Sequence, residues 1–475
     1  MITNILHNAL LASNAKIDKN LNTLTFTAQE AKSTIKLTKI GSPFVDGLEY
    51  RTNINRVWST YTINTEITLT NIGDYVQFQN TNNNQLSVNT NNYVRFIMTG
   101  TITAAGNIQS MLNYSTSCSD YCYYSMFRGC SSLTVAPELP ATTLATGCYH
   151  SMFYDCKNLE FDFETFLKSH KNSTLADYCF AHMVNGCTKV NENRKLIPLS
   201  DWKTNYNTNY ADSCYDGLYA DCKSITQIPE NYLTEIVGST VSFKGLGGFS
   251  SWFKNCTNLR DVPTNLLPFT SLTNSCYSNM FAGCKSLRSA PELPATTLAP
   301  YCYHSMFADC YLLETAPRLP ALTLTKRCYG YMFAECHKLT STPALPATNL
   351  AEECYYNMFG GCTSLTSASK LPATNLAIGC YAHMFSRCYD LVSAPELPAT
   401  TLADSCYSRM FSSCMDLNYV KVRFTDWPPA LTTNSWLNGV SSTGTFVCPA
   451  DLDTTKRGWS YIPEGWTVEL IESNA

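Results

Sequence analysis

The sequence predicts a mainly β protein with short helical turns, built from a small antiparallel β domain, a solenoid of about eleven turns and a C-terminal cap. Two observations predict this class. A nine-residue stretch bounded by cysteines, "CYHSMFADC" from Cys302 to Cys310, recurs in closely related form at a fixed interval through much of the chain. Short alternating runs rich in Thr, Val, Ile and Tyr precede the repeat, and such runs are typical of strands.

The overall composition argues against two classes of partner. The 475 residues carry a formal net charge of −4 and only 15% of them are charged, so the chain lacks the basic surface that holds nucleic-acid phosphates. No run approaches the roughly 18 apolar residues that cross a bilayer, so we expect no membrane span. The opening "MITNILHNALLASNA" has no Lys or Arg ahead of its apolar patch, and we expect no cleaved secretory signal.

Two segments precede the repeat. Residues 1–20 are expected to form a docking tail or helix, because a helix would gather their apolar residues on one face; a disordered tail is the alternative. That face comprises Ile2, Ile5, Leu6, Ala9 and Leu10. Residues 21–105 contain runs such as "STIKLTKI" and "NYVRFIMTGTI", separated by Asn, Gly, Asp and Pro, which predict a small antiparallel sandwich or barrel.

The repeat occupies residues 106–425, with irregular turns over 157–256. Leading cysteines from Cys276 and trailing cysteines from Cys284 each recur every 26 residues. A fixed period of this length marks a solenoid, because one unit cannot bury its own apolar face and must stack on its neighbours. Within each turn we expect a short strand at "LRSAP", which its Pro ends, and a short helical or turn-like return at "CYHSMFADC".

Stacking would place the cysteines in two buried structural columns. In a helical return the two cysteines of one turn would lie roughly 12 Å apart at their Cα atoms, too far for a disulfide. Disulfides between adjacent turns remain an alternative, but the odd total of 23 cysteines and the lack of a secretion signal favour free thiols. The columns comprise Cys276, Cys302, Cys328, Cys354, Cys380 and Cys406, and Cys284, Cys310, Cys336, Cys362, Cys388 and Cys414.

We expect neither a metal nor a cofactor. The cysteine spacing is neither Cys-x2-Cys nor Cys-x4-Cys, and histidine follows the leading cysteine only in some turns, as at His150 and His304. A metal site needs a ligand set that keeps its geometry, which this irregular placement does not provide. A tolerant, surface-facing position explains these histidines better.

The repeat pattern C-Y-x-x-M-F-x-x-C-x-x-L-x-x-x-P-x-L-P-A-x-x-L-A resembles the BspA-like leucine-rich repeat family, whose usual turn carries Ala-Phe-x-x-Cys-x-x-Leu. Met-Phe stands here where Ala-Phe is common in that family, as in Met280-Phe281 and Met332-Phe333. The resemblance covers about two thirds of the chain. It looks like the variant found in gut anaerobes and in their bacteriophages, and it implies a leucine-rich-repeat-type solenoid used for adhesion, without naming a ligand.

The irregular turns are the candidate ligand-binding region. Extra residues inserted into a solenoid become loops on one face. Flat rings suit pyranose faces, and the neighbouring amides and hydroxyls suit sugar hydroxyls, although a subunit interface or ordinary packing explains the loops equally well. The candidate residues are Trp202, Tyr206, Tyr210 and Trp252.

The final 50 residues, 426–475, are expected to cap the repeat. A solenoid needs its last apolar layer covered, and the strands predicted at "TFVCP" and "WTVELI", with large aromatic residues, would cover it. A sugar-stacking platform is the alternative for these rings. They are Trp427, Trp436, Phe446, Trp459 and Trp466.

The sequence contains no Gly-x-Ser-x-Gly elbow, phosphate loop or His-Glu-x-x-His motif. Its recurring Glu in "APELP" indicates a solvated stripe and not an acid/base pair, so we predict a non-catalytic protein.

Together with the resemblance, the lack of catalytic motifs favours a bacteriophage virion structural protein, as a fibre, decoration or tail-associated component assembled in the host cytoplasm. Its N-terminal region would bind other virion proteins as a homo-oligomer, and its rod a host-surface glycan or protein. The alternatives are a BspA-like adhesin on the bacterial cell surface and an intracellular protein-binding scaffold.

Thiol titration tests the expectation of reduced cysteines. In denaturant without reductant, nearly all 23 cysteines should react with a thiol reagent. Reaction of one thiol or none would show that the columns are oxidised.

Overall fold

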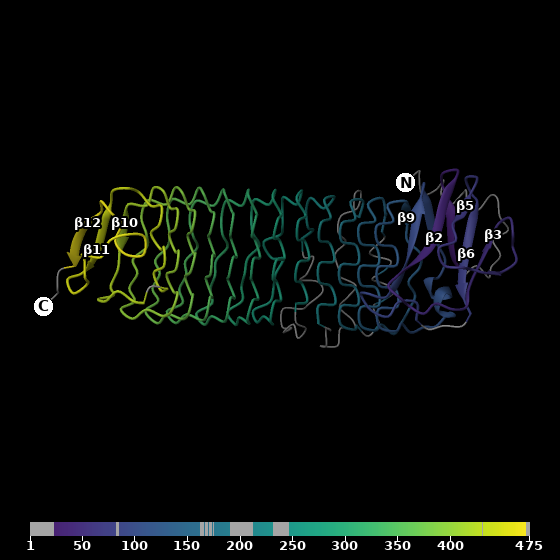
Figure 1. The fold of residues 1–475 in the computed structure, drawn as a ribbon, viewed down its shortest axis with the longest axis horizontal. Helices are drawn as coiled ribbons and strands as arrows, with labels where there is room; N and C mark the ends of the chain where they lie inside the picture. Colours follow the sequence, from purple (N-terminus) through teal and green to yellow (C-terminus); the bar gives the residue numbers. More distant parts are fainter. Residues whose placement is uncertain are drawn as a thin grey trace.

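The computed structural model describes residues 23–81, 85–161, 166, 170, 173, 175–190, 212–230, 247–429 and 431–471. The molecule is elongated, with strands at the N-terminal end, a row of coils along its length and a small sheet at the C-terminal end (Figure 1). In the part of the chain that the structure describes, it is mainly β at its N-terminal end and contains almost no helix. The longest helical segment among the described residues is the 3-10 helix η1, Ile108–Leu112.

Two sheets form the N-terminal module. The larger has the order β4-β3-β6-β1-β8-β9, with β9 contributed by the first coil, and the smaller has the order β5-β2-β7. Phe26 of β1 and Phe96 of β7 lie with ring centroids 4.9 Å apart, so the two sheets share one core. The strands are β1 (Leu24–Ala28), β2 (Ser33–Ile40), β3 (Leu48–Thr52), β4 (Ser59–Thr60), β5 (Ile67–Leu69), β6 (Tyr75–Asn80), β7 (Tyr93–Thr99), β8 (Ile102–Ala105) and β9 (Leu133–Val135).

The first coil is built onto this module. Its strand β9 pairs in parallel with β8, whereas the module's other strand pairs are antiparallel. The Phe96 and Phe127 rings stack 5.4 Å apart, and the Cys130 thiol donates to the Phe96 carbonyl at 3.1 Å. The module therefore covers the first apolar layer of the row of coils.

Successive coils are joined through alternate backbone amides of the nine-residue segment. The amides of Tyr303, Ser305 and Phe307 donate to carbonyls of the next coil at 3.0, 2.8 and 2.9 Å. The amides between them, at His304, Met306 and Ala308, donate three residues back within their own coil. Every amide from 303 to 308 is thereby paired, half of them between coils.

Of the two expected forms of the return segment, helical or turn-like, the turn-like form is correct, because the segment is a run of turns. Every fourth residue has a left-handed backbone, with φ of 58° at Tyr301, 53° at Ser305 and 60° at Asp309. An α-helix needs continuous right-handed dihedrals and bonds to the fourth residue back, and each left-handed residue interrupts both.

The expected short strand forms at the equivalent position of the first coil, as β9, but at "LRSAP" itself it is not an extended element. It is reduced to single parallel bridges between coils, such as Ser289 with Thr315 and Ser341 with Ser367. Pro291 follows two residues after Ser289 and has no amide hydrogen to donate to a ladder, so pairing cannot continue through it.

Aromatic rings stack from coil to coil inside the row. Tyr303 and Tyr329 lie 5.8 Å apart at their centroids with planes 3° apart, and Phe307 and Phe333 lie 5.6 Å apart at 5°. These rings are almost fully buried, together with the intervening Met306. Stacked pairs at this distance add to the apolar burial of each layer.

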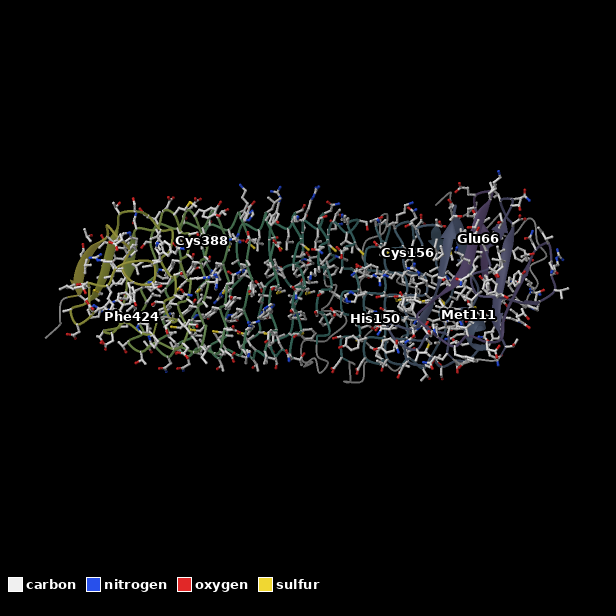
Figure 2. All side chains as sticks on the ribbon, in the orientation of Figure 1. Glu66, Met111, His150, Cys156, Cys388 and Phe424 are labelled. Atoms are coloured by element: carbon white, nitrogen blue, oxygen red, sulfur yellow. The ribbon has the colours of Figure 1, made fainter. Side chains whose placement is uncertain are left out.

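The cysteines lie in the interior as buried free thiols. Each trailing thiol bonds the previous coil: Cys310 donates to the Phe281 carbonyl and Cys336 to the Phe307 carbonyl, both at 3.2 Å. The Phe307 carbonyl also accepts the Cys310 amide at 3.1 Å, so the thiol adds a second bond to an occupied acceptor. Cys156 and Cys388, distant along the rod, lie toward the same side of it (Figure 2).

A three-stranded parallel sheet of the order β10-β11-β12 ends the row. Trp436 is fully buried and packs on Tyr407 of the last regular coil at 6.2 Å, while Phe446 and Trp466 are also buried. Trp459 is 70% exposed, so its expected part in covering the last layer is wrong. The strands are β10 (Tyr419–Lys421), β11 (Thr445–Pro449) and β12 (Thr467–Ile471), the last two at the positions predicted.

Among the described residues, no helix has both the length and the apolar character needed to span a membrane.

Stability should fall at alkaline pH. Burial raises the pKa of the thiols in the two cysteine columns, for example to about 12 at Cys276 and Cys380. The folded chain therefore keeps protons that the unfolded chain releases above about pH 8.5. The stabilisation is therefore complete below that pH and falls as the pH rises toward the folded pKa values, by about 1.4 kcal/mol per pH unit for each such thiol. We expect the thermal midpoint, followed by circular dichroism with a non-thiol reductant, to drop between pH 7 and pH 10. Recovery on return to pH 7 is the control, and an unchanged midpoint would contradict the prediction.

Candidate binding groove

The four ring residues predicted to bind ligand do not form a site in the described structure. Trp202, Tyr206 and Tyr210 lie outside the described residues. Trp252 is only 3% exposed and packs edge-on against Phe249 at 4.9 Å, so it belongs to the core of its coil. This corrects its assignment as a ligand-stacking residue. The repeat spacing indicates this burial: Trp252 stands four residues before Cys256, the position that the core residue Met280 occupies before Cys284.

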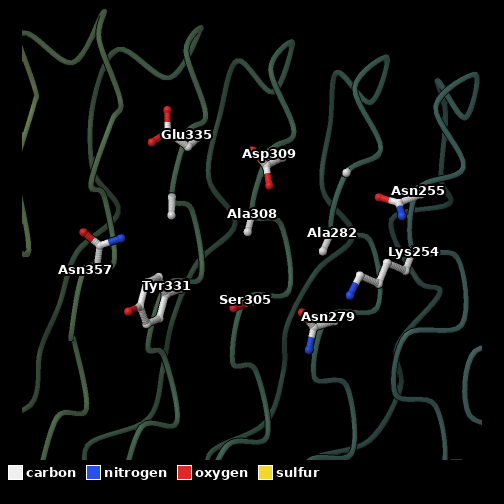
Figure 3. Close-up of a pocket in the computed structure, with 12 residues that line it drawn as sticks. Lys254, Asn255, Asn279, Ala282, Ser305, Ala308, Asp309, Tyr331, Glu335 and Asn357 are labelled. Carbon is white, nitrogen blue, oxygen red and sulfur yellow. The ribbon is translucent and has the colours of Figure 1, made fainter.

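A groove of about 370 Å³ runs across neighbouring coils between Lys254 and Asn357. Figure 3 shows its lining as three rows along the rod. The floor is made by Ala282, Ala308 and Ala334. One wall consists of Asn279, Ser305, Tyr331 and Asn357, and the other of Asn255, Gly283, Asp309 and Glu335.

The groove exists because the floor position carries alanine in three successive coils. The same position, two residues before the trailing cysteine, holds Arg128, Tyr154 and Lys254 in earlier coils. The Arg128 guanidinium lies over the Tyr154 ring at 4.6 Å, so large side chains fill the row there. Replacing such side chains with alanine leaves a trough over the same backbone, and Lys254 lines one end of it.

The residues of both walls have a left-handed backbone conformation. Asn255, Asp309 and Glu335 have φ values of 59°, 60° and 61°, and Gly283 occupies the same row with φ of 75°. Glycine, asparagine and aspartate accept this conformation most readily, which explains their frequency immediately before the trailing cysteine. The amides of Gly283, Asp309 and Glu335 donate to carbonyls of the next coil at 2.7 to 2.8 Å. The main-chain amides of this wall are therefore bonded within the protein.

Side chains supply the polar groups that face the groove. Glu335 contacts Arg387 and accepts from His337 at 3.1 Å, so part of its charge is balanced locally. Ser305 Oγ lies 3.1 Å from His304 Nδ1. Burial lowers the pKa of His304, which keeps this imidazole neutral at physiological pH.

A row of rings supports the wall that contains Tyr331. The Tyr331 ring lies between His304 and Tyr356, at centroid distances of 5.5 and 5.3 Å, and His383 continues the row. These contacts hold Tyr331 in place beside the floor. The arrangement provides hydrogen-bonding groups at coil-to-coil intervals along an open trough. Within the described part of the chain, no three His, Cys, Asp or Glu side chains are grouped so that they could hold a metal ion.

Comparisons of the chain with protein-family models, with curated proteins and with solved structures each give no match. The resemblance to BspA-like repeats therefore stays a prediction.

The left-handed wall can be tested at Asp309. Asp309→Val should destabilise the chain by about 1–2 kcal/mol, because a β-branched residue is strained at this φ, whereas Asp309→Gly should have a much smaller effect. The midpoint of thermal unfolding of the full chain measures both variants. Equal losses for valine and glycine would mean that the carboxylate, and not the backbone conformation, stabilises this position.

Proposed function

We propose that this chain is a non-catalytic structural protein of a bacteriophage particle, in which a leucine-rich-repeat-type solenoid of the BspA-like kind forms an attachment rod. The N-terminal region would dock to other virion proteins as a homo-oligomer, and the rod would contact a glycan or protein on the host surface. The observation that carries this proposal is the coil-to-coil bonding of a single long core, with an open polar groove on its surface.

Rigidity along the rod supports an attachment role. Each layer is joined to the next by backbone amides, by stacked rings such as Tyr303 and Tyr329, and by thiol bonds such as that from Cys336 to Phe307. Bending the row would break these contacts in several columns at once, because each column runs through the same coils. A stiff rod can hold a binding surface at a fixed distance from its docking end.

The N-terminal module supports docking to another protein. Its loops expose several large apolar side chains that a docked partner would cover. They are Phe44, Ile54, Val57 and Ile72. The module shares a core with the first coil through Phe96 and Phe127, so a partner that held the module would also hold the rod.

The thiol-rich interior supports assembly in a reducing compartment. The trailing cysteines donate as thiols, and oxidation would remove both the donor hydrogen and the fit to the layer. A phage protein folds in the host cytoplasm, where thiols are kept reduced. A bacterial surface adhesin with the same groove would fold after export, which makes it the second candidate.

Mass spectrometry of purified phage particles from the source culture, alongside the washed host envelope, tests the proposal. We expect peptides such as "SAPELPATTLAPYCYHSMFADC" in the particles. Peptides found only in the envelope would overturn the virion assignment in favour of the adhesin.

A further inference from the structure

We propose that the groove between Lys254 and Asn357 binds a linear glycan that is neutral or carries amino groups, with its chain lying along the rod. This deepens the attachment role proposed above by naming a site and a ligand class. The glycan is identified by the shape, the polar groups and the charge of the groove.

The elongated shape of the groove favours an extended polymer as its ligand. The floor residues Ala282, Ala308 and Ala334 come from three successive coils and line a trough that runs parallel to the rod (Figure 3). Both walls repeat at the same interval, so the groove offers wall side chains at a regular spacing along the rod, although their chemistry differs from coil to coil. A linear polymer of similar units can use such a series, whereas a compact ligand would use only part of it.

The polar groups match hydroxyl-rich units. Asn279 and Asn357 carry both donors and acceptors, and Tyr331 adds a hydroxyl on a ring held by His304 and Tyr356. Sugar hydroxyls likewise both donate and accept. The half-buried Tyr331 ring and the alanine methyl groups also give the apolar C–H faces of a pyranose a surface to contact.

The backbone argues against an extended peptide as the occupant. Peptides that bind in extended form gain much of their affinity from free main-chain groups at a sheet edge, with pockets for alternate side chains. Here the amides of Gly283, Asp309 and Glu335 already donate to carbonyls of the next coil, those of Ala308, Ala334 and Gly360. The alanine floor offers no deep side-chain pocket, so recognition falls to the wall side chains.

Charge narrows the class of glycan. Asp309 and Glu335 stand on one wall, and Glu335 is partly balanced by Arg387, which leaves Asp309 as the main negative charge beside the floor. The positively charged side chain of Lys254 lines one end of the groove. Sulfated or uronic-acid chains would meet Asp309 along the wall, whereas hydroxyl and ammonium groups would bond to it.

Binding of the full chain to immobilised linear glycans, in neutral, amino-bearing and acidic sets, tests this inference by surface plasmon resonance. Ala308→Tyr fills the floor with a side chain that Tyr154 already places at the same position of another coil, so the variant should fold. We expect retention on neutral or amino-bearing glycans, reduced at least about tenfold by Ala308→Tyr. Ser367→Tyr, an exposed position outside the groove, is the matched control and should bind like the unmodified chain.

A second variant tests the charge. Asp309→Asn keeps a residue that accepts the left-handed backbone, and should weaken binding of amino-bearing glycans by up to about fivefold while changing neutral glycans less. Three outcomes would overturn the inference: no retention of any neutral or amino-bearing glycan, binding confined to acidic glycans, or equal binding by Ala308→Tyr and Ser367→Tyr. None of them depends on whether the chain is found in phage particles, so the two proposals fail separately.

Discussion

The alternate-amide bonding between coils is the interaction on which the rest of the structure depends. Because every second amide of the nine-residue segment reaches the next coil, equivalent residues must lie one above another. That register stacks Tyr303 on Tyr329 and brings the Cys336 thiol to the Phe307 carbonyl. The same bonding leaves left-handed residues at every fourth position, and two of those rows become the walls of the groove.

The irregular coils show how strongly this bonding constrains the chain. The amides of Tyr149, Phe180 and Tyr219 donate to carbonyls of Cys179, Cys214 and Trp252, although the sequence spacing between these coils exceeds the regular 26 residues. The extra residues therefore lie outside the nine-residue segment, and the core layers continue past them. The two ends of the row are covered differently, by the sheets packed at Phe96 and Phe127 and by Trp436 on Tyr407. At each end, an aromatic ring from the covering segment stacks on the terminal ring of a column of stacked aromatic residues.

The floor of the groove varies independently of the stacked core. Its floor position carries small side chains in some coils and Arg128 or Tyr154 in others, while the backbone bonding beneath is unchanged. One position per coil can therefore vary without disturbing the stacked core. In the proposed attachment role, substitution in this single row would change the ligand while the core stayed the same.

The sequence by itself determined the repeat, its period, the apolar residues of each layer and the closing strands β11 and β12, because period and burial pattern can be read along one chain. The tertiary structure alone decided the rest. Tyr301 is not a residue that favours a left-handed backbone, so local preference did not decide between the helical and the turn-like return. Trp252 and Trp459 have the same side chain, yet one is buried by neighbouring coils and the other is exposed. The groove joins residues 26 positions apart, such as Ala282 and Ala308, whose proximity exists only after the coils stack.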